Sequence, residues 1–455
     1  MAIDSEAEMD RQLARRMIDM AVSGGADGAE VYISSKKGVT AESRAGELES
    51  VKTSRDWGYA LRVIKGRRTG FSYSTAEQDA GRVVSSALTA AGYTEEDPFL
   101  RLPEKIFPAA CPEIFDPLVA GISSEDAFAL AREIEGTALG ADKRIKRARS
   151  AAASFHSGEV LIMNTNGFSG GYRTTSVTAQ IMAVAEEGGE SQMGWDFMGS
   201  AFLSDVSFGS VGAGAAQKAL KLLGSKRITP MKAPVVLDSA VAAEFLGVFA
   251  SMLSAESVQK GKSLLKGRLG DVVISKNLSI IDDGLLPHAM GSAPFDDEGV
   301  PTSKKTLIEA GTLKGYMHNT YTAGKAEAGA ASTGNAVKPS LSSFPSVGPL
   351  NFYLGGARGV APVKLEELFA RAGRGLYILE AMGMHTINAV TGEFSIGVAG
   401  LLIEGGRPSH PVKEAVISGN LLDFFKNVEA VGEDLKFYGS TGSPTILIGP
   451  TDISG

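Results

Sequence analysis

The chain has 455 residues, 44% of them hydrophobic and 21% charged, with a formal net charge of -7. It exceeds the ~250–300 residues at which one core usually stops growing, so two domains are expected, 1–228 and 229–455, divided near the segment SKRITPMKAP. The acidic balance argues against nucleic-acid binding. No segment has the features of a signal peptide or the ~18 uninterrupted apolar residues of a membrane span. The single cysteine, Cys111, excludes an internal disulfide and fits a cytoplasmic location.

The first domain is expected to mix helices with antiparallel strands. Residues 5–23 place Leu13, Met17 and Met20 on one face before Gly24 and Gly25, a pattern typical of a helix with its stop signal. Further helices are predicted at 77–91, 124–138 and 210–223. Turn sequences separate short β-branched runs, which predict strands at 29–34, 38–43, 47–53, 58–64 and 68–74 and again over 144–207.

The second domain is expected to be rich in strands. It opens with a strand at 235–238, and the helix that follows, 238–253, begins on Asp238. The chain has 55 glycines, many of them in this half, which favours tight turns between strands. Together the two halves indicate the α+β class.

One carboxylate stands out in the helix DSAVAAEFLGVFASML at 238–253. Glu244 is its only acid after the first residue, in a run of apolar and small residues. With Gly247, Ser251 and Ala255 it is expected on a small-residue face that another element could approach closely. Taken alone, the segment is equally consistent with an ordinary solvated acid.

Two candidate chemistries are not supported by their surroundings. GFSGG at 167–171 matches the G-x-S-x-G pattern that places a nucleophilic serine, here Ser169, on a strand-to-helix elbow. The residues that follow alternate as in a strand, so a hairpin turn is predicted instead. Of the five histidines, the closest pair, His385 and His410, is 25 residues apart, which gives no local metal-ligand spacing.

Two polar segments of the second half are candidates for a binding site. FDDEGVP at 295–301 concentrates Asp296, Asp297 and Glu298, for which a charged turn is the simpler interpretation and a functional rim the alternative. STGNAV at 332–337 is favoured as a plain turn, although its small residues would let a peptide approach the backbone closely.

Several long segments together resemble a known family. They include GELESVKTSRDWGYALRVIKGRRTGFSYS, SLLKGRLGDVVISKNLSIIDDG, GSAPFDDEGVPTSKKTLIEAGTLKGYMHNTYTAGKA, STGNA and VTGEFSIGVAGLLIEGG. In order and spacing, from about residue 10 to the end, they are similar to the TldD/PmbA family of bacterial peptidase subunits, whose members are often called modulators of DNA gyrase. The resemblance implies an α+β N-terminal domain followed by a barrel-like β-rich domain.

The same resemblance distinguishes two branches. In the TldD branch the helix at 238–253 carries His-Glu-x-x-x-His, and a cysteine near the C-terminus is a further zinc ligand. Here the three motif positions fall on Ala243, Glu244 and Val248, and the C-terminal stretch KFYGSTGSPTILIGP contains no cysteine. Alanine and valine cannot donate lone pairs, and a catalytic zinc needs about three protein ligands. The resemblance therefore implies the PmbA (TldE) branch, with no metal in this chain.

The implied function is that of a non-catalytic subunit of a cytoplasmic heteromeric zinc peptidase that degrades or trims unfolded or modified peptides. Its partner would be a TldD-type chain that carries the zinc. Candidates for a peptide cleft are Glu244, Asp296, Asp297, Glu298, Thr333, Gly334 and Asn335. Charge reversal at Asp297 and Glu298 is expected to weaken cleavage without unfolding the chain. Two alternatives remain open, a stand-alone homodimeric peptide-binding protein and a hydrolase with an unrecognised site.

Overall fold

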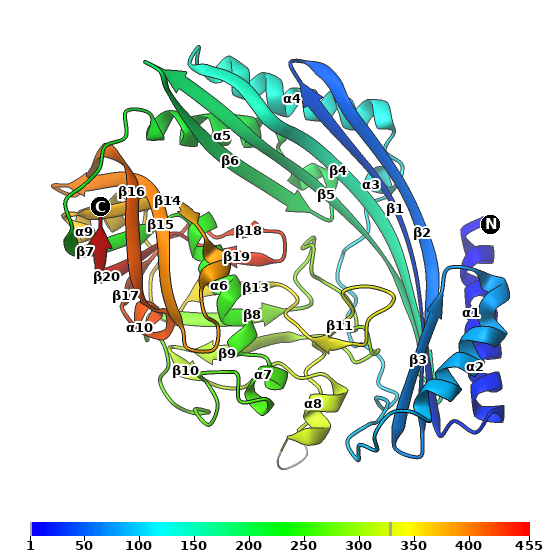
Figure 1. Cartoon of the computed structure of the whole chain (residues 1–455). Coiled ribbons are helices and arrows are strands. Elements are labelled where there is room, and N and C mark those ends of the chain that lie inside the picture. The colour runs from blue at the N-terminus through cyan, green and yellow to red at the C-terminus, as the bar shows by residue number, and fades with distance from the viewer. Residues whose placement is uncertain (1, 327–329) are drawn as a thin grey trace.

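A long curved sheet, formed by the first half of the chain, wraps around one side of the second half (Figure 1). The computed structural model describes residues 2–326 and 330–455 and has the expected α+β architecture. Within these residues, no helix has both the length and the apolar character needed to cross a membrane.

The curved sheet has six antiparallel strands in the order β3-β2-β1-β4-β5-β6. Successive side chains of a strand point to opposite faces, so Val31 and Ile33 pack on the convex face while Glu30 and Tyr32 belong to the concave one. The strands are β1 (Gly28–Arg44), β2 (Glu47–Lys65), β3 (Arg68–Ser74), β4 (Ile145–Asn164), β5 (Ser169–Glu187) and β6 (Glu190–Ser200).

Helices cover the convex face in two groups (Figure 1). Helices α1 (Ala2–Ser23) and α2 (Ala80–Ala91) pack at one end, and α4 (Ser124–Ala141) and α5 (Phe208–Leu222) at the other. The second pair packs closely, because a Cβ added at Gly212 would lie 2.2 Å from the carbonyl oxygen of Ile134. The short elements of this half are η1 (Glu77–Asp79), α3 (Pro117–Ala120) and η2 (Leu203–Asp205).

Two predicted strand breaks are wrong. The segments 29–34 and 38–43 belong to the single strand β1, and 47–53 and 58–64 belong to β2. Residues 35–37, predicted to separate the two strands, are part of β1 and pair with residues 55–57 of β2. Gly38 beside them pairs with His156 of β4, and an added Cβ there would lie 2.2 Å from His156 Nδ1. This glycine therefore makes room for an imidazole on the neighbouring strand. The helix predicted at 77–91 begins with the 3-10 turn η1 before α2.

A closed barrel forms the core of the second half, as expected. Its five strands follow the order β16-β15-β14-β7-β20, and pairing of β16 with β20 closes the ring, while β17 adds to β20. The strands are β7 (Met231–Leu237), β14 (Gly375–Met382), β15 (Glu393–Glu404), β16 (Arg407–Asn420), β17 (Val428–Val431) and β20 (Ile446–Ser454).

A second six-stranded sheet, in the order β10-β9-β8-β13-β19-β18, packs beside the barrel. Helix α6 lies between the two, and its Phe245 and Phe249 are fully buried in a core to which both contribute. The strands are β8 (Leu278–Asp283), β9 (Lys304–Glu309), β10 (Thr312–Leu313), β13 (Phe352–Gly356), β18 (Lys436–Tyr438) and β19 (Thr441–Ser443), with β11 (Ala336–Val337) and β12 (Ser346–Val347) forming a separate pair. The helices are α6 (Ser239–Met252), α7 (Ala255–Gln259), α8 (Thr320–Lys325), α9 (Leu365–Ala372), η3 (Met384–Thr386) and α10 (Leu421–Lys426).

Candidate functional site

Helix α6 is fixed at its N-terminus by Asp238, the residue directly after β7. One Asp238 carboxylate oxygen accepts a hydrogen bond from Ala240 N at 3.2 Å, and the other accepts one from the Tyr377 hydroxyl at 2.8 Å. An aspartate at this position satisfies a backbone N–H that the helix itself leaves unpaired. The helix start predicted at Asp238 is thus confirmed, and barrel strand β14, which carries Tyr377, determines where α6 points.

One face of α6 is open. Glu244, Gly247 and Ser251 are exposed and Val248 is half-buried, a spacing of three and four residues that marks one side of a helix. Ala243 is only 3% exposed and faces the core. The expectation that Ala255 shares the open face is wrong, because α6 ends at Met252 and Ala255 begins α7 in a buried position.

The Glu244 carboxylate has no hydrogen bond or ion pair with any other residue in the described part of the chain. The surrounding protein raises its pKa by desolvation. The carboxylate is therefore reached by water, yet enough protein surrounds it to disfavour its charge.

The C-terminal hairpin of β18 and β19 packs against α6. Tyr438 of β18 places its hydroxyl oxygen 2.9 Å from Ser239 Oγ in the first turn of the helix. The two stretches in which the family resemblance placed zinc ligands are therefore adjacent. They do not fit a zinc centre, because Ala243 and Val248 offer no donor atoms, and no group of three or more His, Cys, Asp or Glu residues within 2–326 and 330–455 could hold a metal ion.

The segments 296–298 and 333–335 are adjacent to each other. Asp296 accepts three backbone hydrogen bonds, from Glu298 N at 3.0 Å, Val300 N at 2.9 Å and Ala336 N at 2.9 Å. Asp297 accepts one from Lys338 N at 2.7 Å. The two loops are thus held together by carboxylate-to-backbone bonds.

Side-chain hydrogen bonds also fix the Thr-Gly-Asn segment at 333–335. Thr333 donates to Asn335 Oδ1 at 2.7 Å, and Asn335 donates to Asp282 Oδ2 at 2.8 Å. Gly334 has φ 69°, and a Cβ there would lie 2.5 Å from the carbonyl oxygen of Pro301. Only glycine fits this close approach of two backbone segments.

Glu298 joins the second half of the chain to the curved sheet. It is completely buried, and its Oε1 pairs with Arg62 of β2 at 2.9 Å while its Oε2 accepts from Thr320 N at 2.8 Å. Arg62 also pairs with Glu30 of β1 at 3.0 Å. Residues 297–298 do form the predicted turn, between the paired Phe295 and Pro301, but its acids Asp296 and Glu298 are buried at a junction. Burial raises the pKa of Asp296, Asp297 and Glu30.

Glu244 is not joined to that junction by any contact among the described residues. Helix α6 packs on β13, β14, β18 and β19, whereas the junction lies against β1 and β2. The structure thus separates the sequence candidates into the open face of α6 and the buried junction.

A cavity of 700 Å³ lies between the concave sheet and the loop at 338–341. Lys338 enters it with its amine 5.0 Å from the ring centre of Tyr32 and 4.9 Å from that of Phe71, and burial lowers the pKa of this amine to about 8. Further lining residues are Ser34, Lys36, His156, Thr174, Ser176 and Met290. The cavity wall therefore combines apolar surface with several hydroxyl groups.

Serine chemistry finds no support in the geometry. Ser169 is the first residue of β5 and follows the β4–β5 turn, which confirms the predicted hairpin. His288 has its Nδ1 2.7 Å from Asp205 Oδ2, and Ser200 donates to the same carboxylate at 2.9 Å. Ser200 donates to this carboxylate and to the His288 carbonyl oxygen and accepts from Phe202 N at 3.1 Å, but no hydrogen bond joins it to the imidazole among the described residues, so the arrangement is not that of a serine with its general base.

Four residues were missed from sequence: Arg62, Trp195, Phe197 and Tyr438. Arg62 is a lone charge in the apolar run GYALRVI, a signal that could have indicated a buried partner. Trp195 and Phe197 alternate with Asp196, which places both rings on one face of a strand.

Three sequence profiles of one family match the chain over most of its length. The PmbA/TldA metallopeptidase C-terminal domain matches residues 230–455, the central domain 117–223 and domain 1 residues 29–91. The chain belongs to the PmbA/TldD metallopeptidase family. The predicted family is thereby confirmed, and the expected boundary near 228 lies between the central and C-terminal matches.

Relatives from both branches of the family are similar to the chain. Metalloprotease PmbA of Escherichia coli O157:H7 is 30% identical, with 100% of this chain and 99% of that protein covered. A TldD homologue of Haemophilus influenzae is 26% identical over 83% of this chain and 80% of its own. Among solved structures, a candidate modulator of a DNA gyrase from Thermotoga maritima has a TM-score of 0.89 at 27% identity, covering 98% of this chain and all of its own. TldE from Thermococcus kodakarensis, at 21% identity, shares the fold with a TM-score of 0.87, covering 97% of this chain and 100% of that one.

Proposed function

We propose that this chain is the non-catalytic subunit of a cytoplasmic heteromeric zinc peptidase and that a TldD-type chain supplies the metal centre. The observation that carries the proposal is the composition of α6 and the hairpin packed on it. Ala243 and Val248 occupy the motif positions of zinc-binding histidines, and Tyr438 meets the helix from the C-terminal stretch. A catalytic zinc cannot be held by these side chains.

The chain keeps the fold of its family although it lacks the zinc ligands, which supports a structural role in the enzyme. Two chains with the same domain plan can associate about a pseudo-two-fold axis, which evolves readily from a symmetric homodimer. One chain can then lose its metal ligands while its surface still confines the substrate. The substrates would be unfolded or modified peptides, as the resemblance to the family implies.

The candidate substrate-facing residue on α6 is Glu244. It is exposed, has no partner among the described residues and has a raised pKa, properties that often mark functional positions. The buried acids at 296–298 would instead act by holding the second half of the chain to the curved sheet.

The test compares three samples: this chain alone, its TldD-type partner alone and an equimolar mixture, each incubated with an unstructured peptide. We expect cleavage by the mixture to exceed the sum of the separate rates. Equal cleavage by the partner alone would disprove the subunit function and favour a peptide-binding homodimer. Cleavage by this chain alone would favour the unrecognised hydrolase.

A further inference from the structure

The 700 Å³ cavity under the loop at 338–341 lies where two glycines leave the concave face of the curved sheet without side chains. Gly58 and Gly158 belong to this face, because they pair with Ser34 and Lys36 of β1. Leu341 of the loop packs over Gly58, where an added Cβ would lie 2.5 Å from Leu341 Cδ2. At Gly158 an added Cβ would meet nothing closer than 3.2 Å, so the cavity floor stays open there.

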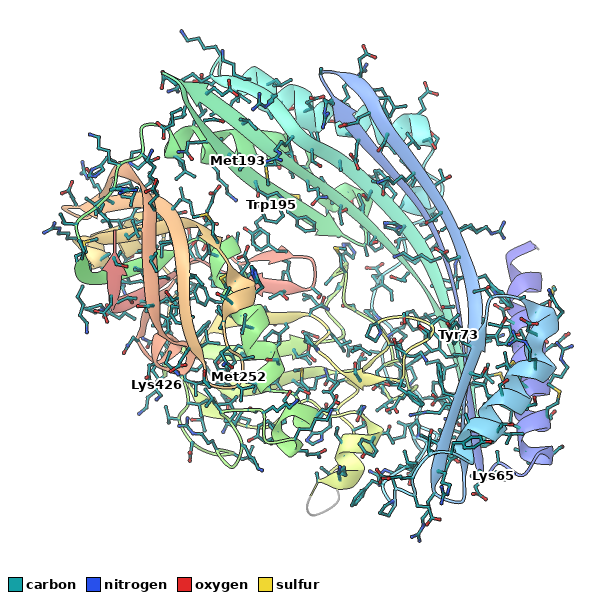
Figure 2. All side chains as sticks on the ribbon, viewed as in Figure 1. Lys65, Tyr73, Met193, Trp195, Met252 and Lys426 are labelled. Carbon is teal, nitrogen blue, oxygen red and sulfur yellow. The ribbon has the colours of Figure 1, made fainter. Side chains whose placement is uncertain are left out.

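The loop over the cavity is fixed at its base. Asp297 accepts a hydrogen bond from Lys338 N at 2.7 Å, and β11, which directly precedes Lys338, pairs with β12. Side chains of the two halves of the chain meet in this region beside Tyr73 of β3 (Figure 2), which lies in the same cross-strand row as Tyr32. The Lys338 backbone is therefore held in place, and its side chain enters the cavity from a defined position.

The ammonium group of Lys338 lacks an acceptor. It lies between the rings of Tyr32 and Phe71 and forms no ion pair or hydrogen bond within the part of the chain that the structure describes. Lys305 and Lys436, by contrast, pair with carboxylates at 3.2 and 2.7 Å. A lysine carries three N–H donors, and an enclosed cation without a partner is costly. The amine is therefore available to an anion that enters the cavity.

The acids of the neighbouring junction are already engaged. Glu30 and Glu298 both pair with Arg62, at 3.0 and 2.9 Å. The Asp297 carboxylate is occupied by the Lys338 backbone N–H rather than by its amine. These acids therefore leave the Lys338 ammonium without a direct partner.

The other charges of the cavity wall largely offset one another. Lys36 and Asp56 are exposed and occupy paired positions of β1 and β2. Glu159 pairs with Arg173 at 3.1 Å. The charge of Lys338 is thus the unbalanced one on this wall.

The cavity wall also offers hydroxyl donors beside apolar surface. Ser34 of β1 and Ser176 of β5 line it, and neither hydroxyl has a hydrogen-bond partner among the described residues. Met290 and Leu341 contribute apolar surface. A carboxylate accepts hydrogen bonds through both oxygens, most strongly from a charged donor. The wall is therefore suited to a carboxylate carried by a partly apolar ligand, and its volume is that of a small-ligand site.

From this geometry we infer that the cavity binds a carboxylate of an unfolded peptide, with the Lys338 ammonium as its ion-pair partner and the Ser34 and Ser176 hydroxyls as hydrogen-bond donors. The carboxylate is that of the peptide C-terminus or of an acidic side chain. The inference rests on the proposed function and adds to it a preference by which a chain without a metal centre would select peptides for its partner.

Direct binding to the isolated chain tests the site. Three peptides share one unstructured Gly/Ser/Leu-rich sequence. The first ends in a free carboxylate, the second ends in an amide, and the third ends in an amide and has one internal glycine replaced by glutamate. By calorimetry we expect an acidic peptide to bind roughly tenfold more tightly than the neutral amide, the scale of one charge-assisted contact.

The two acidic peptides distinguish the sources of the carboxylate. A preference for the first peptide alone identifies a site for the C-terminus, and a preference for the third shows that an acidic side chain is sufficient. Equal affinities for all three peptides, or no binding of any, would overturn the inference. These results do not depend on cleavage by the mixed enzyme, which tests the proposed function separately.

Substitutions in the chain locate the bound carboxylate. Lys338→Met removes the charge but keeps a long side chain, so it should abolish the preference for an acidic peptide, while Lys338→Arg should retain part of it. Gly158→Val, which fills the open floor, should weaken binding of all three peptides. Lys105→Met is the matched control, because the Lys105 amine lies 5.2 Å from the Phe107 ring centre but is exposed and outside the cavity. An undiminished preference in Lys338→Met would contradict the inference.

Discussion

Arg62 and Glu298, which are 236 residues apart in sequence, form an ion pair at 2.9 Å across the junction between the curved sheet and the second half of the chain. Both side chains are nearly or fully buried, and Glu30 provides Arg62 with a second carboxylate at 3.0 Å. A buried ion pair of this kind adds little to the stability of the fold compared with an apolar pair of similar size. Removal of one partner is costly, however, because it leaves a buried charge uncompensated. The junction is therefore sensitive to single substitutions.

Charge reversal at Glu298 should unfold or strongly destabilise the protein. Glu298→Lys would place a cation against Arg62 and leave Thr320 N without its acceptor. We expect the free energy of unfolding to fall by about 3–5 kcal/mol or more. The sequence-based expectation that this change leaves the fold intact is thereby revised.

The matched control is Glu309→Lys. Glu309 also forms an ion pair, with Lys314 at 3.3 Å, but both side chains are about half exposed, at 60% and 48%. Its reversal should change stability by less than about 1 kcal/mol. Denaturant titration of both variants measures the two changes in the free energy of unfolding. Equal losses of stability would show that burial of the Arg62–Glu298 pair does not make it more important than an exposed pair.

Gly334→Ala should destabilise the protein through a steric clash. Gly334 and Gly439 both have left-handed φ values, 69° and 70°, so alanine is strained at either position. Only at position 334 would the new Cβ meet a neighbour, the Pro301 carbonyl oxygen at 2.5 Å, while the space at 439 is open. We expect Gly439→Ala to cost about 1 kcal/mol and Gly334→Ala clearly more. Similar melting temperatures for the two variants would contradict this account of the 333–335 loop.

Glu244→Gln should alter the pH dependence of stability. Burial raises the folded-state pKa of Glu244 above its ordinary value of 4.5, so the wild type loses stability as pH rises through the interval between these two values. Glutamine does not ionise. The variant should therefore be more stable than the wild type at neutral pH, and the difference should vanish below about pH 4.

Thermal melts at a series of pH values measure this difference. Glu47→Gln, an exposed change in the β1–β2 hairpin, serves as the control. An advantage of Glu244→Gln that is the same at every pH would show that ionisation is not its cause.

Restoring the two histidines should not restore an efficient enzyme. Ala243 is 3% exposed, so Ala243→His must push a larger side chain into a packed core, at a cost of about 1–3 kcal/mol. Val248→His, at a half-buried position, should be tolerated. The double variant would still lack a thiolate and the surrounding groups that orient metal ligands.

Peptide cleavage by the double variant, assayed with and without added zinc, gives the answer. We expect no zinc-dependent cleavage. Rapid zinc-dependent turnover would mean that the metal site is more intact than its residues suggest.

Local patterns were sufficient to predict much of the fold. The α6 start at Asp238 and the β4–β5 hairpin each depend on residues that are neighbours in sequence. The strand breaks predicted at 35–37 and 54–57 were wrong because residues 35–37 of β1 pair with 55–57 of β2, a contact that neither segment reveals in its own sequence. Polar residues inside a long pair of strands have the same local pattern as residues of a turn.

The candidate site was only partly predictable for the same reason. A charged turn was predicted at 296–298, but its burial was not, because nothing near these acids in sequence could neutralise a buried charge. Arg62 and the backbone donors of 336–338 reach them only in the folded chain. The contacts of Trp195 and Phe197 on β6 with Tyr438 on β18 likewise join strands from both halves, and no pattern within either strand predicts that they meet.

The central claim is that this chain lacks the metal centre that its family uses and depends on a partner for it. Elemental analysis of the isolated chain and of its complex with the TldD-type chain tests this most directly. We predict almost no zinc in the isolated chain and about one zinc per heterodimer, as expected for a single catalytic site. About one zinc bound at α6 of the isolated chain would contradict the claim.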